Sequence, residues 1–386
     1  MTAAGGGSAS TAASSSQRSG AASSHGVRLA CAGRPRLTGA LLLLLAALSH
    51  AAAQPFDPPR GDTRLVVLGD FNGPYGSTDY PPPLARVIDA ITGTWLPDAV
   101  VFPGDVIAGQ SRDLTREDLD AMWRSFDEHV AAPLRAAGIA YALAVGNHDA
   151  SSLRSGGAYA FPRDREAAAA YWSDPVHRAG LEVHDDADVP FHYSFSVGGV
   201  FVAVIDASSP LVPEERRAWL AEQLASEPAR RASVRLVVGH LPLVAFSVGR
   251  EAPGERLADA EDLADLMREG CAAAYVSGHH AAYYPGVWRG LELLAAGGIG
   301  ARRLLGWDGA PRSTVTVVDV WEATGELTYT TFDAVTLAPL TPDDLPAALP
   351  SGVTLSARAG GAVAATAGGG GTAATCAGEG RLAADR

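Results

Sequence analysis

The chain has 386 residues, a hydrophobic share of 47% and a formal charge of −13, and all thirty of its basic residues are arginine. This length suits one large domain or two ordinary ones. Without residues 1–53, which hold four arginines and no acid, 26 basic and 43 acidic residues remain, a formal charge of −17. Such an acidic surface repels a phosphate backbone, which argues against polymeric nucleic acid as a partner.

Residues 1–53 are predicted to be a targeting segment rather than part of the fold. Residues 1–26 are rich in Ser, Ala and Gly, and three arginines then precede the apolar run Leu41–Leu48. This run is too short to cross a membrane, and Ala51–Ala53 fits a cleavage site before Gln54. We therefore expect a cleaved signal peptide, a periplasmic or secreted protein, and no stable membrane insertion after cleavage. An uncleaved anchor is the alternative.

The rest of the chain is expected to form one domain between two regions of low complexity. A Pro-rich linker covers residues 54–63, and the domain is expected over residues 64–340. Residues 150–190 have little periodicity beyond one short helical stretch, and we interpret them as a lid or insertion. Residues 352–386 are rich in Gly, Ala and Thr, which predicts a disordered tail.

Two cysteines lie beyond the targeting segment. Cys271 begins an apolar stretch, and Cys376 lies in the Gly/Ala-rich tail. A disulfide between them is possible in an oxidising compartment, but the pattern favours a core thiol and an isolated one.

Apolar runs of strand length alternate with stretches of helical periodicity along the domain. Thr115 and Asp118 form a capping pair that predicts the start of a long helix, and Gly198 and Gly199 predict a β-hairpin. The strands are too numerous for one simple parallel sheet, so we expect two packed sheets with helices outside. Strands are predicted at residues 65–68, 100–103, 139–144, 191–197, 200–205, 236–238, 274–277, 291–295, 313–321 and 327–332, and helices at 84–91, 116–137, 166–172, 213–225 and 259–269.

Five predicted strands run into a glycine followed by a side chain that can bind metal or transfer a proton. Glycine lets the chain turn sharply off a strand end, and ligands of open α/β sheets bind beyond the carboxyl ends of the strands. The five ends are therefore expected to form one metal site with oxygen and nitrogen ligands. They are Gly69-Asp70, Gly104-Asp105, Gly146-Asn147-His148-Asp149, Gly239-His240 and Gly278-His279.

In this order the five motifs resemble those of the calcineurin-like metallophosphoesterase family, over roughly residues 64–335. The resemblance implies a four-layer α/β/β/α sandwich of two mixed sheets, with two metal ions bridged by a carboxylate. It also implies that a small phosphomonoester or phosphodiester is hydrolysed by attack of metal-bound hydroxide. Mixed imidazole, carboxylate and amide ligands suit Mn, Fe or Zn.

The resemblance further implies a role for each motif residue. Asp105 bridges the two metals, and Asp70 belongs to the first of them. His148 faces the leaving oxygen or the transferring phosphoryl group, and Asp149 holds its ring. The implied metal ligands are Asp70, Asn72, Asp105, Asn147, His240 and His279, the last three completing the second site with the bridging carboxylate.

Two departures from the family pattern fall on the first metal. Asp70-Phe71-Asn72 stands where the family usually has Asp-x-His, and Gly278-His279-His280-Ala281 stands where it has Gly-His-x-His. Asn72 is either an oxygen ligand or a turn former, and Ala281 offers no ligand. His280 is expected to be structural, because neighbouring strand residues point to opposite faces. The first metal should therefore be weak or replaced by a harder ion such as Mg or Mn.

Two other functions remain compatible with these residues. A catalytically impaired relative would keep the fold and act as a binding protein, and a hydrolase of non-phosphate esters would use the same strand-end ligands. Arg250, Arg302 and Arg303 could meet a phosphate. Because arginine is the only basic residue type in this chain, we assign them to the surface instead.

Overall fold

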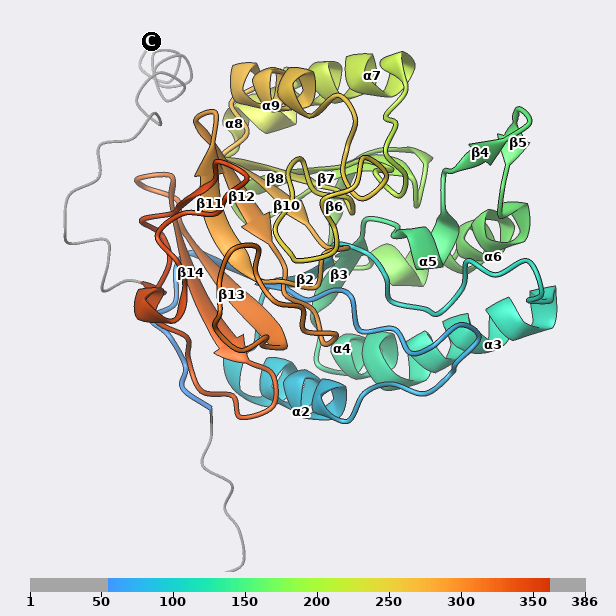
Figure 1. Cartoon of the computed structure of the whole chain (residues 1–386), viewed down its shortest axis with the longest axis horizontal. Helices are drawn as coiled ribbons and strands as arrows, with labels where there is room; N and C mark the ends of the chain where they lie inside the picture. Colours follow the sequence, from blue (N-terminus) through green and yellow to red (C-terminus); the bar gives the residue numbers. More distant parts are fainter. Residues whose placement is uncertain (1–54, 362–386) are drawn as a thin grey trace, which may run out of the picture. The chain divides into compact units, whose positions relative to one another are not determined.

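The computed structural model describes residues 55–361 (Figure 1). The predicted signal peptide lies outside the described residues, as does the part of the predicted tail beyond residue 361. Within residues 55–361, no helix has the length and apolar character needed to cross a membrane.

Two mixed sheets form the centre of the described domain. The first has the strand order β14-β13-β1-β2-β3, in which β1, β2 and β3 are parallel and β13 is antiparallel to β1 and β14. The second has the order β15-β11-β12-β10-β9-β8-β7-β6, with β8, β9, β10 and β12 parallel. The first sheet comprises β1 (Thr63–Val67), β2 (Ala99–Phe102), β3 (Ala140–Leu143), β13 (Thr314–Trp321) and β14 (Glu326–Asp333). The second comprises β6 (Glu182–Asp188), β7 (His192–Val197), β8 (Val200–Val204), β9 (Val234–Val238), β10 (Ala274–Ser277), β11 (Tyr284–Trp288), β12 (Leu291–Ala295) and β15 (Thr354–Leu355).

Helices cover the outer face of each sheet (Figure 1). α2, α3 and α4 pack against the five-stranded sheet, and α7, α8 and α9 pack against the eight-stranded one. The fold is therefore the expected four-layer α/β/β/α sandwich of two mixed sheets. The helices are α2 (Pro83–Ala90), α3 (Arg116–Phe126), α4 (Ala132–Ala136), α5 (Asn147–Ala150), α6 (Pro162–Trp172), α7 (Glu214–Leu224), α8 (Glu227–Arg231) and α9 (Ala260–Glu269). Short turns of other helix types are η1 (Ile91–Trp95), η2 (Asp127–Ala131), η3 (Pro175–Arg178) and η4 (Pro342–Asp344), and β4 (Arg154–Ser155) and β5 (Ala158–Tyr159) form a separate pair.

Alternation along the strands sorts the apolar side chains into three buried layers. In β1, Leu65 and Val67 face the other sheet, whereas Val66 packs against the helices. In β9, Val238 lies between the sheets and Val237 lies under α7 and α9. An apolar layer thus joins the two sheets and fixes their strand ends relative to one another.

Two local predictions are confirmed. The long helix begins as α3 with a capping box, in which the Asp118 amide donates to Thr115 Oγ1 at 3.2 Å and the Thr115 amide donates to Asp118 Oδ2 at 2.9 Å. The hairpin is formed by β7 and β8, which pair on either side of Gly198, and Gly198 has a φ of +52°.

Residues 150–190 are more regular than the sequence predicted, although the one helix expected there is present as α6. Helix α6 buries Ala167, Ala168 and Trp172 in the core of the helical layer beside the five-stranded sheet. Strand β6 pairs with β7 as an edge of the eight-stranded sheet. The alanine run of α6 gives little hydrophobic periodicity, and the polar sequence of β6 reflects its partly exposed edge position.

Residues 352–361, the described part of the tail predicted to be disordered, are ordered. Strand β15 pairs with β11, and Val353 and Ala359 are buried at 0% and 3% exposure. The domain therefore extends beyond the predicted boundary at residue 340. Small buried residues and glycine turns gave this segment the composition of a disordered chain.

The described part of the predicted linker, residues 55–63, is held to the domain by the buried Arg64. The Arg64 guanidinium pairs with Asp319 at 2.9 Å and with Asp57 at 2.6 Å, and donates to the carbonyl of Pro58 at 2.7 Å. The side chains of Arg64 and Asp319 are each 1% exposed. Hydrogen bonds and ion pairs therefore compensate the burial of the Arg64 and Asp319 charges, as buried charges require.

We predict that Arg64→Met lowers the free energy of unfolding by about 3–5 kcal/mol, because it leaves the buried Asp319 carboxylate without its cation. Arg60→Met is the matched control, since Arg60 forms an ion pair with Asp98 that is 42% and 38% exposed. Its loss should cost less than about 1 kcal/mol. Urea denaturation measures both, and equal losses would contradict the role given to Arg64.

Candidate metal centre

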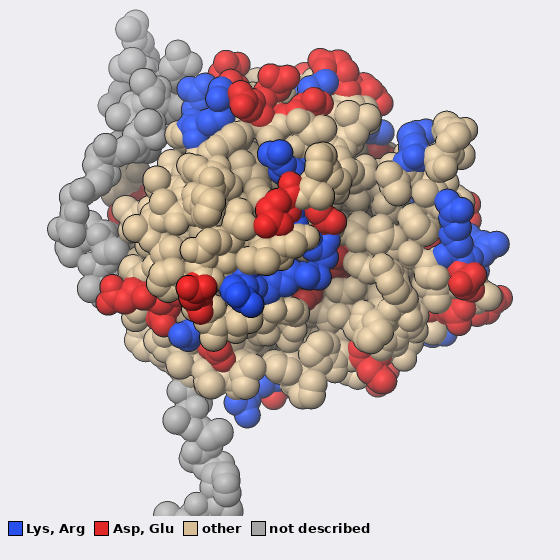
Figure 2. Space-filling model, viewed as in Figure 1, with Lys and Arg blue, Asp and Glu red and all other residues tan. Residues whose placement is uncertain are grey.

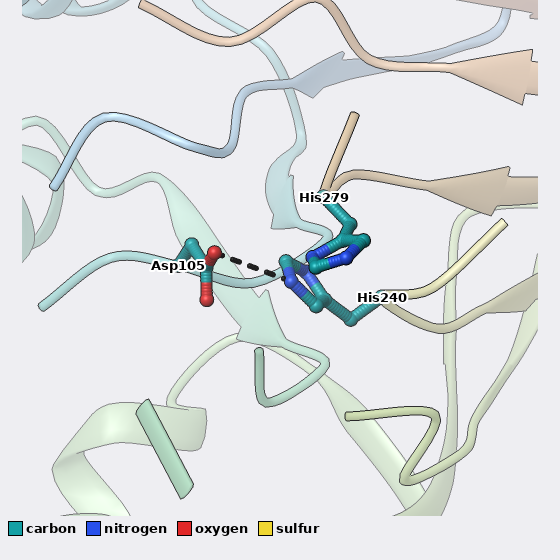
Figure 3. Close-up of side chains that lie close together, drawn as sticks. All are labelled: Asp105, His240 and His279. Carbon is teal, nitrogen blue, oxygen red and sulfur yellow. Dashed lines mark ion pairs between the residues drawn. The ribbon is translucent and has the colours of Figure 1, made fainter. Parts of the chain in front are cut away.

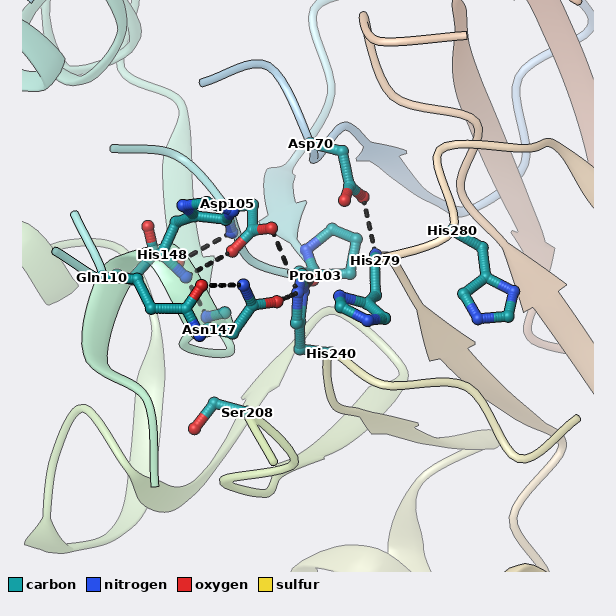
Figure 4. Close-up of polar contacts among 12 residues, drawn as sticks. Asp70, Pro103, Asp105, Gln110, Asn147, His148, Ser208, His240, His279 and His280 are labelled. Atoms are coloured by element: carbon teal, nitrogen blue, oxygen red, sulfur yellow. Dashed lines mark hydrogen bonds and ion pairs between the residues drawn. The ribbon is translucent and has the colours of Figure 1, made fainter. Parts of the chain in front are cut away.

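The carboxyl ends of five parallel strands meet at one edge of the sandwich, as the motifs predicted (Figure 4). The first sheet contributes Asp70, Asp105 and Asn147, and the second contributes His240 and His279. None of these five residues is more than 9% exposed. The predicted ligands of both sheets are therefore assembled in one buried polar cluster.

Three residues of this cluster have left-handed backbone conformations, which are rare for residues other than glycine. The φ values are +48° for Asp70, +57° for Asp105 and +65° for His279. Such conformations cost about 1–3 kcal/mol each and persist only where the surroundings enforce them. At each of these strand ends the site residue itself makes the sharp turn that aims its side chain into the cluster.

The glycines before these residues allow close packing as well as turning. A Cβ atom at Gly278 would overlap Oδ2 of Asp70, and one at Gly146 would overlap Oδ1 of Asp105. Gly104 also has a φ of +93°. These glycines therefore serve both to turn the chain and to leave room for the neighbouring carboxylates, and the sequence predicted only the first of these roles.

Asp105, His240 and His279 each present one ligand atom within 4.8 Å of the others (Figure 3). Asn147 joins them, because its Oδ1 lies 2.9 Å from Nε2 of His240. The Asn147 side chain is oriented by Gln110, whose Oε1 accepts a hydrogen bond from Nδ2 at 2.8 Å. One carboxylate, one amide oxygen and two imidazoles are a donor set typical of transition-metal sites.

The ring of His240 is oriented for ligation by a backbone contact. Its Nδ1 lies 2.7 Å from the carbonyl oxygen of Pro103, which can only accept, so Nδ1 carries a proton and Nε2 faces Asp105 at 3.3 Å. Burial opposes the charged form of this ring. The carboxylates of Asp105 and Asp70 outweigh burial and raise the pKa of His240 to about 9. Metal binding at Nε2 would therefore release a proton.

The pKa values of the two central carboxyl groups are shifted in opposite directions. Burial raises the pKa of Asp70 to about 8, and the neighbouring Asp105 adds to this rise. Burial also raises the pKa of Asp105. The surrounding imidazoles, chiefly that of His240, outweigh burial and hold the pKa of Asp105 below its usual range. Asp105 is therefore the ionised carboxylate of the cluster.

The expected contact between Asp149 and the ring of His148 is wrong. Asp149 is fully buried, and its carboxylate accepts hydrogen bonds from the amides of Asp105, Gly146, Val106 and Ile107 at 2.7, 2.7, 2.8 and 3.0 Å. Nδ1 of His148 instead lies 3.2 Å from the carbonyl oxygen of Gly109. His148 and Asp149 are successive residues of α5, so their side chains point in different directions. Asp149 is a structural residue that braces the loop carrying Asp105.

The three residues that the sequence places at the first metal position have different surroundings in the structure. Asp70 is present, with Oδ2 accepting a hydrogen bond from the His279 amide at 3.0 Å. Asn72 is half-buried, and its backbone amide donates to the carbonyl of Asp105 at 3.3 Å. Ala281 offers no ligand atom.

His280 is structural, as expected, and its ring points away from the cluster (Figure 4). The ring is fully buried, with Nδ1 accepting from the Phe246 amide at 3.1 Å and Nε2 lying 2.8 Å from the carbonyl of Glu255. It therefore cannot replace the histidine that Ala281 lacks.

Glu255 and Arg250 were not identified as site residues from the sequence. Glu255 Oε2 lies 2.9 Å from Nε2 of His279, and Arg250 forms an ion pair with the same carboxylate. Because a carboxylate can only accept, Nε2 of His279 carries the proton and Nδ1 is left with its lone pair. Both residues lie in the loop after β9, and no motif or spacing in that loop marks them.

Comparison with known proteins identifies the family. Residues 63–283 match the family described as calcineurin-like phosphoesterase, which is more than half of the chain. The chain belongs to the calcineurin-like phosphoesterase family. The resemblance drawn from the motifs is thereby confirmed, and metal dependence is a property of that family.

Individual relatives match parts of the chain. The serine/threonine-protein phosphatase CPPED1 of Bos taurus is 30% identical over 120 residues, which are 29% of this chain and 38% of that protein. The match therefore spans less than two thirds of that relative. Purple acid phosphatase PPD1 from yellow lupin (Lupinus luteus) seeds has a similar structure, with a TM-score of 0.50 and 15% identity over 75% of this chain and 54% of that one. GAP50, the anchor in the inner membrane complex of Plasmodium, has a TM-score of 0.47 and 12% identity over 70% of this chain and 84% of that one.

We predict that Glu255→Gln lowers the affinity for Mn²⁺ about 10–100-fold, because partners that orient a ligating histidine typically contribute that much. Titration calorimetry on the metal-depleted protein measures the change. Glu251→Gln is the control, since Glu251 is exposed in the same loop. Unchanged Mn²⁺ affinity in Glu255→Gln would show that the carboxylate does not act through His279.

We also predict a pH effect from His280, whose pKa is lowered by burial from 6.5 to about 4. The unfolded chain binds this proton more readily, so the stabilisation is complete above pH 6.5 and is lost as the pH falls towards 4. When the pH falls from 7.5 to 5, the proton linkage of His280 should lower the free energy of unfolding by about 2 kcal/mol. His280→Gln keeps a donor and an acceptor but does not titrate, so it should lose less stability over that interval. Urea denaturation in a chelator compares the two, and equal losses would disprove the assignment.

Proposed function

We propose that this protein is an exported, metal-dependent hydrolase of small phosphomonoesters or phosphodiesters. The observation that carries the proposal is the convergence of Asp105, Asn147, His240 and His279 from two sheets onto one point. Membership of the phosphoesterase family supports the reaction class. The acidic surface makes a small substrate more suitable than a polymeric nucleic acid.

The residues of the second metal position fit a divalent ion such as Mn, Fe or Zn, whereas a harder ion such as Mg or Mn is the one expected at the first position. His240 and His279 each have one ring nitrogen held by an acceptor outside the cluster, which leaves the other nitrogen for ligation. Asp105 supplies a negative charge and Asn147 a neutral oxygen. When bound there, the ion would supply Lewis acidity towards a phosphoryl oxygen and a water molecule.

His148 is the residue best placed to move a proton. Its Nδ1 faces the carbonyl of Gly109, so Nδ1 donates there and Nε2 can exchange a proton with the leaving oxygen. The backbone amide of His148 donates to Oδ1 of Asp105 at 2.9 Å, which ties the ring to the metal centre. The ring of Tyr75, with a centroid distance of 5.1 Å, covers one side of the imidazole.

Export is proposed from the sequence of residues 1–53, with its arginines, apolar run and Ala51–Ala53 site. Cys271 agrees with this proposal. It is half-buried and disulfide-bonded, rather than the core thiol expected from the sequence, and disulfides persist mainly in oxidising compartments such as the periplasm and the exterior.

The alternative function is that of a catalytically impaired relative that acts as a binding protein. It is favoured by one observation, the loss of both imidazoles from the first metal position at Asn72 and Ala281. Such a protein would bind metal at the intact position and show no turnover.

Hydrolysis of a generic aryl phosphate with and without Mn²⁺ tests the proposal. We predict Mn²⁺-dependent turnover in the wild type, and at least about a 100-fold loss of metal affinity and turnover in Asp105→Asn, because Asp105 is itself a ligand. Asp113→Asn, at an exposed carboxylate, is the control. Full activity in Asp105→Asn would refute the proposal, metal binding without turnover would favour the binding protein, and preference for an aryl carboxyl ester would favour a different esterase.

A further inference from the structure

We propose that Arg250 and Arg302 take the place of the first metal ion and bind the substrate phosphate beside a single metal at the second position. This inference rests on the proposed function, since it assigns two further residues to the same site. It starts from a disagreement between the family's two-metal centre and the residues present. Asn72 and Ala281 supply no imidazole there, so Asp70 and the bridging Asp105 do not fit a first metal ion of the usual kind.

The loop that carries Arg302 lies directly against this incomplete position. The Ile299 amide donates to the carbonyl of Asp70 at 3.0 Å, and the Arg302 amide donates to the carbonyl of Ala281 at 2.7 Å. The loop is therefore anchored to the remaining ligand of the first metal and to the residue that replaced the missing one.

The loop that carries Arg250 pairs with the same segment. Ser247 and Leu304 form an antiparallel bridge, the Val248 amide donates to the carbonyl of Arg303 at 3.0 Å, and the Leu305 amide donates to that of Phe246 at 2.8 Å. This pairing places two arginine-bearing loops side by side at the edge of the cluster. Figure 2 shows basic side chains gathered across the middle of the face viewed, next to acidic ones.

Arg250 reaches the metal centre itself. Its Nη1 lies 3.3 Å from Nε2 of His279 and pairs with Glu255, and its side chain is 23% exposed. One edge of the guanidinium is thereby fixed, and the other remains for a ligand. Arg302 is exposed, and within residues 55–361 its guanidinium makes no hydrogen bond or ion pair.

The electrostatic surroundings of Arg302 include groups of the same cluster. Burial and the neighbouring Arg250 lower the pKa of Arg302, while Glu255 and Asp70 act in the opposite direction. Two guanidinium groups carried by paired loops at one edge of the cluster form a suitable site for a dianion such as a phosphate group. A metal ion at the first position would neutralise the same phosphate charge, so the arginines can substitute for it electrostatically.

Binding of inorganic phosphate to the Mn²⁺-loaded full chain tests this inference, with metal content measured on the same samples. Arg302→Ala and Arg250→Gln should each weaken phosphate binding about tenfold, the effect of losing one charge-assisted contact. Manganese content should stay near one equivalent in Arg302→Ala. Because Arg250 also pairs with Glu255 beside His279, Arg250→Gln is compared at a Mn²⁺ concentration that keeps one equivalent bound. Arg303→Ala, the exposed neighbour whose backbone joins the loop pairing, should bind phosphate like the wild type.

Two results would overturn the inference. One is wild-type phosphate affinity in both Arg302→Ala and Arg250→Gln, and the other is a wild-type protein that holds two equivalents of manganese. Either result would leave Mn²⁺-dependent aryl phosphate hydrolysis intact. Failure of the proposed function would appear differently, as absence of that hydrolysis in the wild type whatever the arginine variants do.

Discussion

The buried carboxylate of Asp149 is the constraint on which the site depends. It accepts four backbone amides, three from the loop after β2 and one from the turn after β3. These hydrogen bonds offset the cost of burying the carboxylate. Burial raises the pKa of Asp149 to about 6. The same hydrogen bonds also hold Asp105 in its left-handed conformation and bring the turn with Asn147 against it. Asp149 thus fixes Asp105 and Asn147, which follow two different strands, through backbone amides rather than through their side chains.

In the second sheet, a backbone carbonyl orients one of the two histidines and charged side chains orient the other. His240 is locked by the carbonyl of Pro103, a residue of the first sheet's loop, whereas His279 is held by Glu255 and through it by Arg250. The cost of burying so many charges is met by pairing opposite ones at short range. Because the apolar layer between the sheets fixes their separation, small side-chain movements at Glu255 would change His279 without disturbing His240.

The sandwich and the meeting of the strand-end residues could be predicted from the sequence, because apolar strands that end in glycine have a clear periodic signal. These residues are Asp70, Asp105, Asn147, His240 and His279. The predicted contact of Asp149 with His148 was wrong, because the two are adjacent in sequence but α5 turns their side chains apart. The role of Glu255 could not be predicted, because a loop of irregular backbone has no periodicity and the contact with His279 depends on how two loops pair. Composition likewise misjudged residues 352–361, where small buried residues resemble a disordered chain.

Asp70 has a structural role in addition to the metal-binding role that the family resemblance implies for it. Its Oδ2 accepts the amide of His279, and its carbonyl accepts that of Ile299, so it links β1 of one sheet to two loops of the other. Burial raises the pKa of this carboxyl group to about 8, and both its ionised and its neutral form can accept the hydrogen bond from the His279 amide. The presence of Asp70 therefore does not by itself imply a first metal ion. Because loss of Asp70 would free the left-handed His279, the second metal position depends on it even where the first position holds no ion.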